Sequence, residues 1–179
     1  MTQTMQLVLG SQTYMQQFAK QATTPTRLLK DVEKDRDFAL LDLKGAIPFV
    51  SPVRGTVLAH YGTVPAYGYI ALMYFKLGKD EAGVFVSQMT EFTDQADRLE
   101  GCDAMVLMET DNPHLEYLLL SAWNRKLDVY TAQNTPLYAP VRTFAQRAQA
   151  GFGYHRAIYT IVDPDHPTKA LTAEAASAD

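Results

Sequence analysis

The sequence predicts an α+β fold in which two sheets pack face to face. Three observations favour this fold: one long amphipathic helix pattern, short apolar runs on both sides of it, and an ordinary globular composition. Of the 179 residues, 47% are hydrophobic, 20% charged and 11% aromatic. Such a chain has enough apolar surface to offset the entropy lost on ordering, so disorder throughout is excluded.

The charge balance and the ends of the chain limit its partners and compartment. Sixteen Lys and Arg against 20 Asp and Glu give a net charge of −4, which argues against a nucleic-acid partner. The longest apolar run is about six residues, far below the ~20 that cross a bilayer, so no membrane partner is expected. The N-terminus has no signal-peptide pattern, and Cys102 is the only cysteine. We therefore expect a cytoplasmic protein without disulfides.

The first half, residues 1–63, consists of short elements. The patterns predict a helix at Gln12–Lys20 and strands at Gln6–Leu9, Arg27–Leu29, Phe38–Leu43 and Ile47–Val50. Pro48 restricts the last of these strands to a sheet edge. Val53–His60 fits either a strand or a short helix, and the loop that starts at Tyr61 is the expected junction with the second half.

The second half, residues 64–163, contains the clearest helix of the chain. Its apolar positions recur at spacings of three and four residues: Ala82, Phe85, Met89, Phe92, Ala96 and Leu99. This periodicity predicts an amphipathic helix with one buried stripe. Asp80 stands where an N-cap residue belongs, and Gly101 ends the pattern.

The elements around this helix complete a recognisable order. Strands are predicted at Tyr67–Leu77, Asp103–Glu109, His114–Trp123 and Tyr154–Val162, and further helices at Asn124–Gln133 and from Thr135 to Ala148. The order β–α–β–β–α–β is ferredoxin-like. Helices cover one face of such a sheet, so its other face needs a second sheet, which the first half supplies. A pocket is expected between sheet and helices, and residues 164–179 read as a disordered tail.

Several segments resemble one known family. In the second half they are Tyr67–Leu77, the stripe from Phe85 to Leu99, Cys102-Asp-Ala-Met-Val-Leu-Met-Glu and Tyr117-Leu-Leu-Leu-Ser-Ala-Trp-Asn. In the first half they are Leu7-Val-Leu-Gly, Phe38-Ala-Leu-Leu-Asp-Leu-Lys-Gly and Phe49-Val-Ser-Pro. Together they resemble the antibiotic biosynthesis monooxygenase superfamily, in particular its two-half HmoB-like and TRAP-like branch. The resemblance runs from Gln6 to about Val162 and implies a dimeric-type α+β barrel, with a degenerate ferredoxin-like first half.

The resemblance also implies a site, which this sequence keeps only in part. Haem-degrading members place an Asn on the strand that opens the ferredoxin-like unit, a Trp at the end of its third strand, and an iron-ligating His on the next helix. The matching positions here are Met73 or Tyr74, Trp123 and Arg142. Only the tryptophan is kept, and a guanidinium cannot ligate iron.

Three of the expected pocket residues have two interpretations each. Trp123, the candidate catalytic residue, either presses a flat substrate against the sheet or fills the core. Arg142 either pairs with a carboxylate of the ligand or is a solvated helix residue. His155 is either an iron ligand or acid/base group, or a hydrogen-bonded strand histidine. The remaining expected lining residues are Met73, Tyr74, Phe92 and Tyr138. No metal-ligand spacing of histidines and no carboxylate pair for acid/base work occurs.

Three functions follow from this reading. The first is a monooxygenase of the resembled type that acts on a flat aromatic or tetrapyrrole compound and requires no cofactor. The second is a non-catalytic binding or stress-related protein with the same fold. The third is a haem-degrading monooxygenase with altered ligation, in which haem is the substrate. The expected partner is a small aromatic molecule, and the fused first half favours a monomer or a loose homodimer.

Overall fold

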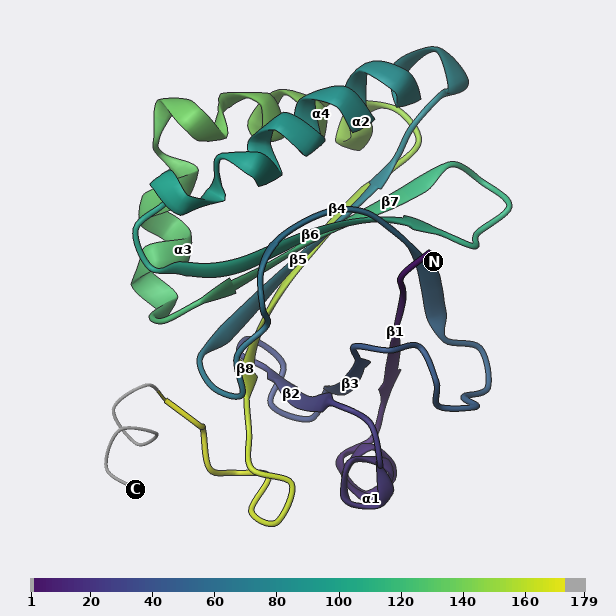
Figure 1. Ribbon diagram of the computed structural model, residues 1–179, viewed down its shortest axis with the longest axis vertical. Helices are drawn as coiled ribbons and strands as arrows, with labels where there is room; N and C mark the ends of the chain where they lie inside the picture. Colours follow the sequence, from purple (N-terminus) through teal and green to yellow (C-terminus); the bar gives the residue numbers. More distant parts are fainter. Residues whose placement is uncertain (1, 173–179) are drawn as a thin grey trace.

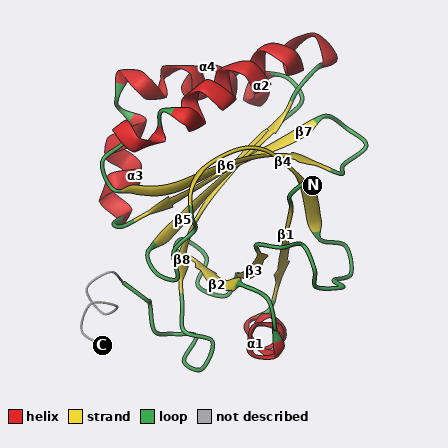
Figure 2. Ribbon diagram, in the orientation of Figure 1, coloured by secondary structure: helices red, strands yellow, loops and turns green. Residues whose placement is uncertain are grey.

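The computed structural model describes residues 2–172 (Figures 1 and 2). Its elements are β1 (Thr4–Gly10), α1 (Gln12–Gln21), β2 (Thr26–Asp31), β3 (Phe38–Asp42), β4 (Val53–Gly62), β5 (Tyr69–Lys76), α2 (Lys79–Asp94), η1 (Ala96–Arg98), β6 (Cys102–Thr110), β7 (Glu116–Trp123), α3 (Lys126–Gln133), η2 (Pro136–Tyr138), α4 (Ala139–Ala150) and β8 (Tyr154–Ile161). Helices α2, α3 and α4 lie together on one side of the strands, whereas α1 lies at the opposite end of the molecule.

The eight strands form one closed antiparallel barrel. Their order around it is β1-β3-β2-β8-β5-β7-β6-β4, and β4 pairs with β1 to close it. Each half contributes four neighbouring strands. The first half supplies them in the order β4-β1-β3-β2, and the second half repeats this order with β8-β5-β7-β6. The halves join where β2 meets β8 and where β4 meets β6. The predicted α+β fold, with two ferredoxin-like halves in one barrel, is confirmed.

Three buried clusters follow from the alternation of side chains along the strands. One fills the barrel and includes Ile70, Leu72, Leu118 and Leu120. A second lies between the outer face of the second-half sheet and helices α2–α4. The third lies between α1 and the outer face of the first-half sheet, around Met15. The second-half sheet is therefore covered by helices outside and by the first-half sheet inside, as the sequence predicts.

The amphipathic stripe is buried as expected, but the helix is shorter than predicted. Phe85, Met89 and Phe92 of α2 are at most 2% exposed and lie in the cluster under the helices. The helix ends at Asp94; of the last two positions of the stripe, Ala96 lies in the turn η1 and Leu99 directly follows it. Asp80 is not the N-cap, because the helix begins at Lys79 and Gly78 caps it. Asp80 lies in the first turn, where a carboxylate interacts favourably with the helix N-terminus.

In the first half, the segment after β3 replaces the second helix of a ferredoxin-like unit. Residues Ile47–Val50 form no strand, contrary to the prediction. The buried carboxylate of Asp42 organises this segment instead: Oδ1 accepts from the backbone N–H of Lys44 and Gly45, and Oδ2 from that of Ile47. The side chain of Gln6 donates to the same Oδ2 at 2.9 Å. These hydrogen bonds lower the pKa of Asp42 although burial alone would raise it.

Strand β4 connects the halves and resolves the ambiguity of Val53–His60 in favour of a strand. Its register shifts between Val57 and Ala59, which is a β-bulge or irregularity. Val53 and Val57 pack on the barrel interior, whereas Ala59 and Tyr61 pack on the helix side. The extra residue thus reverses which face each side chain occupies, as a bulge does.

The chain after β8 is ordered as far as it is described, which corrects the expectation of disorder from residue 164 onward. Val162 forms an isolated bridge with Ala170, and the N–H of Leu171 donates to Ile161. The carbonyl of Leu171 in turn accepts from Gly68 at 2.8 Å. These backbone bonds fix the segment beside the start of β5. Residues 173–179 lie outside the described range. Within that range, no helix is long and apolar enough to cross a membrane.

Replacing Phe92 by aspartate is expected to unfold most of the molecule. The ring is 2% exposed and meets Tyr138 edge-on at 5.2 Å. An unpaired charge there lowers the free energy of unfolding by about 4 kcal/mol or more. Val84→Asp is the matched control, because Val84 is 53% exposed on the same helix. Chemical denaturation measures both variants, and a Phe92→Asp protein as stable as Val84→Asp would contradict this placement.

The fragment 64–163 tests whether the second-half sheet needs its partner. Without the first half, the inner residues Ile70, Leu72 and Leu120 lose the cover of Leu7 and Leu29. We expect the fragment to aggregate or to dimerise through this face, since a large exposed apolar patch drives association. Size-exclusion chromatography with light scattering reports the outcome. A soluble, stably folded monomer would show that the inner face does not require the first half.

Candidate functional site

A hollow of about 280 Å³ lies between the second-half sheet and helix α4. We call it the helix-side hollow; it is lined by Met73, Gln133, Asn134, Tyr138, Val141, Arg142, Ala145, Gln146, Tyr154 and Arg156. Its volume is just below that of typical ligand sites, which span roughly 300–1,000 Å³. It is therefore suited to a compound of two or three rings.

The break between α3 and α4 shapes this hollow. The sequence predicts one helix from Thr135 to Ala148, but Pro136 begins the short turn η2 and α4 starts at Ala139. The turn places Tyr138 beneath the helices, where it is 3% exposed. Its hydroxyl donates to the sulfur of Met73 on β5 at 3.7 Å. Phe92 packs against the Tyr138 ring and so supports this wall from behind.

Two arginines converge on Gln133. Arg142 donates to the backbone carbonyls of Gln133 and Thr135 at 2.5 and 3.0 Å. Arg156 donates to the side-chain oxygen of Gln133 at 2.9 Å. Within the described residues, Nε2 of Gln133 is buried and has no hydrogen-bond partner. An unpaired buried donor is costly, so it marks a place where a ligand oxygen would be stabilised.

The hollow carries positive charge and hydrogen-bond donors but no base. None of its lining residues is acidic or a histidine. Burial raises the pKa of Tyr138. Burial likewise raises the pKa of Tyr154, although the nearby Arg156 partly opposes this. Both phenols therefore stay protonated at neutral pH, and the arrangement favours an anionic ligand.

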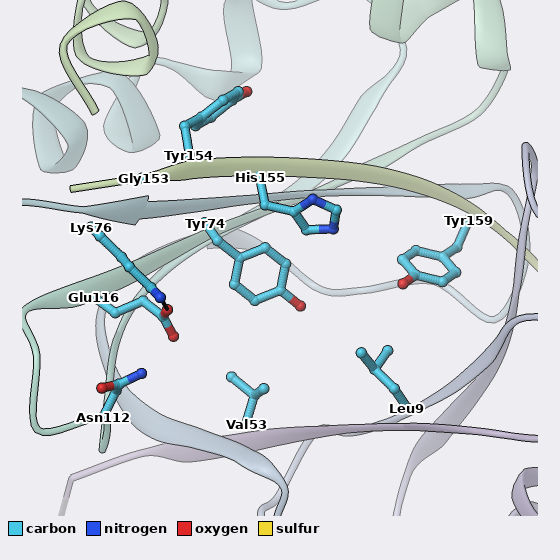
Figure 3. A pocket seen from close by; sticks show the side chains of 10 residues that line it. All are labelled: Leu9, Val53, Tyr74, Lys76, Asn112, Glu116, Gly153, Tyr154, His155 and Tyr159. Carbon is cyan, nitrogen blue, oxygen red and sulfur yellow. Dashed lines mark ion pairs between the residues drawn. The ribbon is translucent and has the colours of Figure 1, made fainter. Parts of the chain in front are cut away.

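A second hollow, of about 480 Å³, opens on the inner side of the same strands (Figure 3). We call it the barrel mouth; it is lined by Leu9, Val53, Tyr74, Lys76, Asn112, Glu116, Gly153, Tyr154, His155 and Tyr159. Tyr74 and His155 are direct partners across β5 and β8, with ring centroids 5.7 Å apart.

Five of the seven residues expected in one pocket are divided between these two hollows, and Phe92 and Trp123 line neither of them. Met73, Tyr138 and Arg142 line the helix-side hollow. Tyr74 and His155 do not: they line the barrel mouth. The reason is strand alternation, because Met73 and Tyr74 are consecutive residues of β5 and must point to opposite faces. The expectation that Tyr74 and His155 share the helix-side pocket is therefore wrong.

Trp123 lies in the core under the helices. Its side chain is 0% exposed, and its indole N–H donates to the hydroxyl of Ser121 at 2.7 Å. The ring is part of the same buried cluster as Phe92. This geometry corresponds to the core-filling interpretation of the tryptophan.

Sequence reasoning missed Gln133, Tyr154 and Arg156 of the helix-side hollow. Tyr154 and Arg156 flank His155 on β8, and alternation applied to that strand would have placed both on the face opposite to His155. Gln133 gave no signal of its own, because it reaches the hollow only where α3 ends and the chain turns into η2.

Cys102 lines neither hollow, and the described residues of both hollows include no cluster of metal-ligating side chains. Burial raises the pKa of the Cys102 thiol to about 12, so the reactive thiolate is scarce at neutral pH. Among the residues that the structure describes, no group of three or more His, Cys, Asp or Glu side chains is placed to hold a metal ion.

Comparison with known proteins identifies the fold of the chain. No family model and no curated protein matches the sequence. Among solved structures, an uncharacterized ferredoxin-fold protein from Listeria monocytogenes, related to antibiotic biosynthesis monooxygenases, matches with a TM-score of 0.78 and 18% identity, over 90% of this chain and 95% of that one. A heme-degrading enzyme from Listeria monocytogenes matches with a TM-score of 0.73 and 18% identity, over 88% and 98%.

A third solved structure, of an anthrone oxidase-like protein, matches with a TM-score of 0.67 and 11% identity, over 95% of both chains. The chain therefore has the ferredoxin-like α+β fold of proteins related to antibiotic biosynthesis monooxygenases. The resemblance noted in the sequence is confirmed at the level of the fold.

Because the pKa of a buried tyrosine is raised, we expect the free energy of unfolding to fall at alkaline pH. Burial, with the carboxylates of Asp31 and Asp37, raises the pKa of Tyr159 to about 12, against about 10 in an unfolded chain. Between pH 10 and 12 the unfolded state releases this proton first, so the free energy of unfolding falls as the pH rises. Tyr159→Phe should flatten this decline in urea titrations, whereas Tyr14→Phe, at an exposed ring, should not. An unchanged slope for Tyr159→Phe would contradict the assignment.

Proposed function

We propose that the helix-side hollow binds the anion of a flat aromatic phenol or enol and promotes its oxygenation without a dedicated cofactor. The observation that carries this proposal is the polar cluster at Gln133. Nε2 of Gln133 lacks a partner among the described residues, whereas Arg142 donates to the backbone carbonyl of Gln133 and Arg156 to its side-chain oxygen. Two planar guanidiniums and a free amide donor suit a phenolate, enolate or carboxylate oxygen on a planar ring.

The chemistry proposed requires the protein to stabilise charge rather than to move a proton. The hollow has no base, so the ligand ionises because the two guanidiniums lower the pKa of its acidic group. The electron-rich anion then reacts with O₂. In the net step a ring CH₂ group and O₂ become a ring C=O group and water, so the substrate itself supplies the four electrons. The protein contributes confinement and a fixed positive field. Solved neighbours named heme-degrading enzyme and anthrone oxidase-like protein support an oxidative function for this fold.

Anthrone is a suitable probe for turnover, because its central CH₂ group ionises to a flat enolate. We expect O₂ uptake and anthraquinone formation above the protein-free rate. Arg156→Gln should lower kcat/KM about tenfold, the effect of losing one charge-assisted contact. Arg147→Gln is the matched control, because Arg147 lies on α4 outside the hollow, over the ring of Phe144.

A specific observation also favours binding without turnover, namely the absence of any base among the lining residues. Calorimetry with 1-hydroxy-2-naphthoate and its neutral methyl ester separates the two functions. A non-catalytic binding protein would bind the anion more tightly than the ester, would lose this preference with Arg156→Gln, and would not turn over anthrone. Equal affinity for the anion and the ester would contradict the proposed site altogether.

Haem-iron ligation is not favoured in the helix-side hollow. Arg142 occupies the position that the resemblance assigns to the ligand, and the sulfur of Met73 accepts the Tyr138 hydroxyl. His155 faces the barrel mouth instead. We therefore expect haemin to bind weakly, without a histidine-ligated absorption band and without ring opening when a reductant is added. Tight one-to-one binding that His155→Ala abolishes would restore the haem-degrading alternative.

A further inference from the structure

The barrel mouth has the composition of a ligand site of its own, on the face of the sheet opposite to the helix-side hollow. One wall carries Tyr74 and Tyr159, and the facing wall carries Leu9 and Val53 (Figure 3). Leu9 is 58% exposed although it lies on a barrel strand. An exposed apolar side chain beside the half-buried Tyr74 and the buried Tyr159 provides a surface that a largely apolar compound would cover.

Two tyrosine hydroxyls point into this space. In Figure 3 the hydroxyls of Tyr74 and Tyr159 are directed toward the gap that Val53 and Leu9 face. Neither forms a hydrogen bond with another protein group in the described part of the chain. Burial raises the pKa of both, and Tyr159 raises that of Tyr74 further, as expected of two neighbouring phenols. Both groups are therefore protonated donors at neutral pH.

The charges around the barrel mouth select against anions. The carboxylates of Asp31 and Asp37 act on Tyr159, and that of Glu116 acts on Tyr74. The basic residues of the lining are Lys76 and His155, and Lys76 is held 4.0 Å from Glu116 in an ion pair. A bound anion would meet these carboxylates, and the ammonium group of Lys76 is already paired with Glu116.

We propose that the barrel mouth binds a neutral, largely apolar compound whose carbonyl oxygen accepts hydrogen bonds from the hydroxyls of Tyr74 and Tyr159. The carbonyl supplies the acceptor that these two donors lack. The rings of the compound cover Leu9 and Val53. This site is separate from the proposed anion site, because its two hydroxyl donors lie on the inward face of β5 and β8 and its ligand carries no charge; Tyr154, at the start of β8, borders both hollows.

Fluorenone and fluorene test this proposal as a matched pair, because they share a flat skeleton and differ in the carbonyl group. We expect fluorenone to bind about tenfold more tightly than fluorene in equilibrium dialysis, the effect of two hydrogen bonds. Tyr74→Phe and Tyr159→Phe should each weaken fluorenone binding about threefold and leave fluorene unchanged. The double variant should bind both compounds equally. The carbonyl stretch of bound fluorenone should shift to lower frequency, and the double variant should abolish the shift.

Two controls locate the compound. Tyr14→Phe, at an exposed ring on α1, should leave fluorenone binding unchanged. Arg156→Gln, which weakens the anion site, should also leave it unchanged. The proposal is overturned if fluorenone and fluorene bind equally, if neither binds, or if Arg156→Gln weakens fluorenone while the tyrosine variants do not. Because phenylalanine keeps each ring, the variants test the hydroxyls without removing the packing.

Discussion

The alternation of side chains along β5 and β8 is the constraint on which both candidate sites depend. These paired strands stand between the helix layer and the barrel interior. Met73 and Tyr74 are neighbours in sequence, yet one lines the helix-side hollow and the other lines the barrel mouth. A single sheet thus presents Met73 and the Arg156 guanidinium outward and the phenols of Tyr74 and Tyr159 inward, and no change of register can exchange them without exposing the core.

Closure of the barrel within one chain keeps this sheet in place. The first half repeats the strand order of the second but lacks its second helix. The carboxylate of Asp42 replaces that helix by holding the following loop through backbone N–H groups, with Gln6 as an additional donor. The inner face of β5–β8 is therefore covered without a second subunit. The same arrangement leaves Leu9 of β1 open at the barrel mouth.

The sequence predicted those features that depend on local pattern. The stripe of Phe85, Met89 and Phe92 and the β–α–β–β–α–β order followed from periodicity, and the structure confirms both. The division of the expected pocket into two hollows was not predicted. To predict it, each strand residue must first be assigned to the inward or the outward face of the sheet, and only then grouped with others. The loop at Asp42 was mistaken for a strand because apolar Ile47–Val50 resembles one locally, whereas long-range hydrogen bonds decide its conformation. Gln133 depends on where α3 ends, which periodicity does not determine.

The central claim is that the two hollows are separate and prefer opposite ligand chemistry. Methyl NMR tests it most directly, with labelled Met73 in the helix-side hollow and labelled Val53 in the barrel mouth. We expect 1-hydroxy-2-naphthoate to shift the Met73 methyl signal alone and fluorenone to shift the Val53 methyl signals alone. If both compounds shift the same methyl group, the two faces of the sheet do not define separate sites and the account is contradicted.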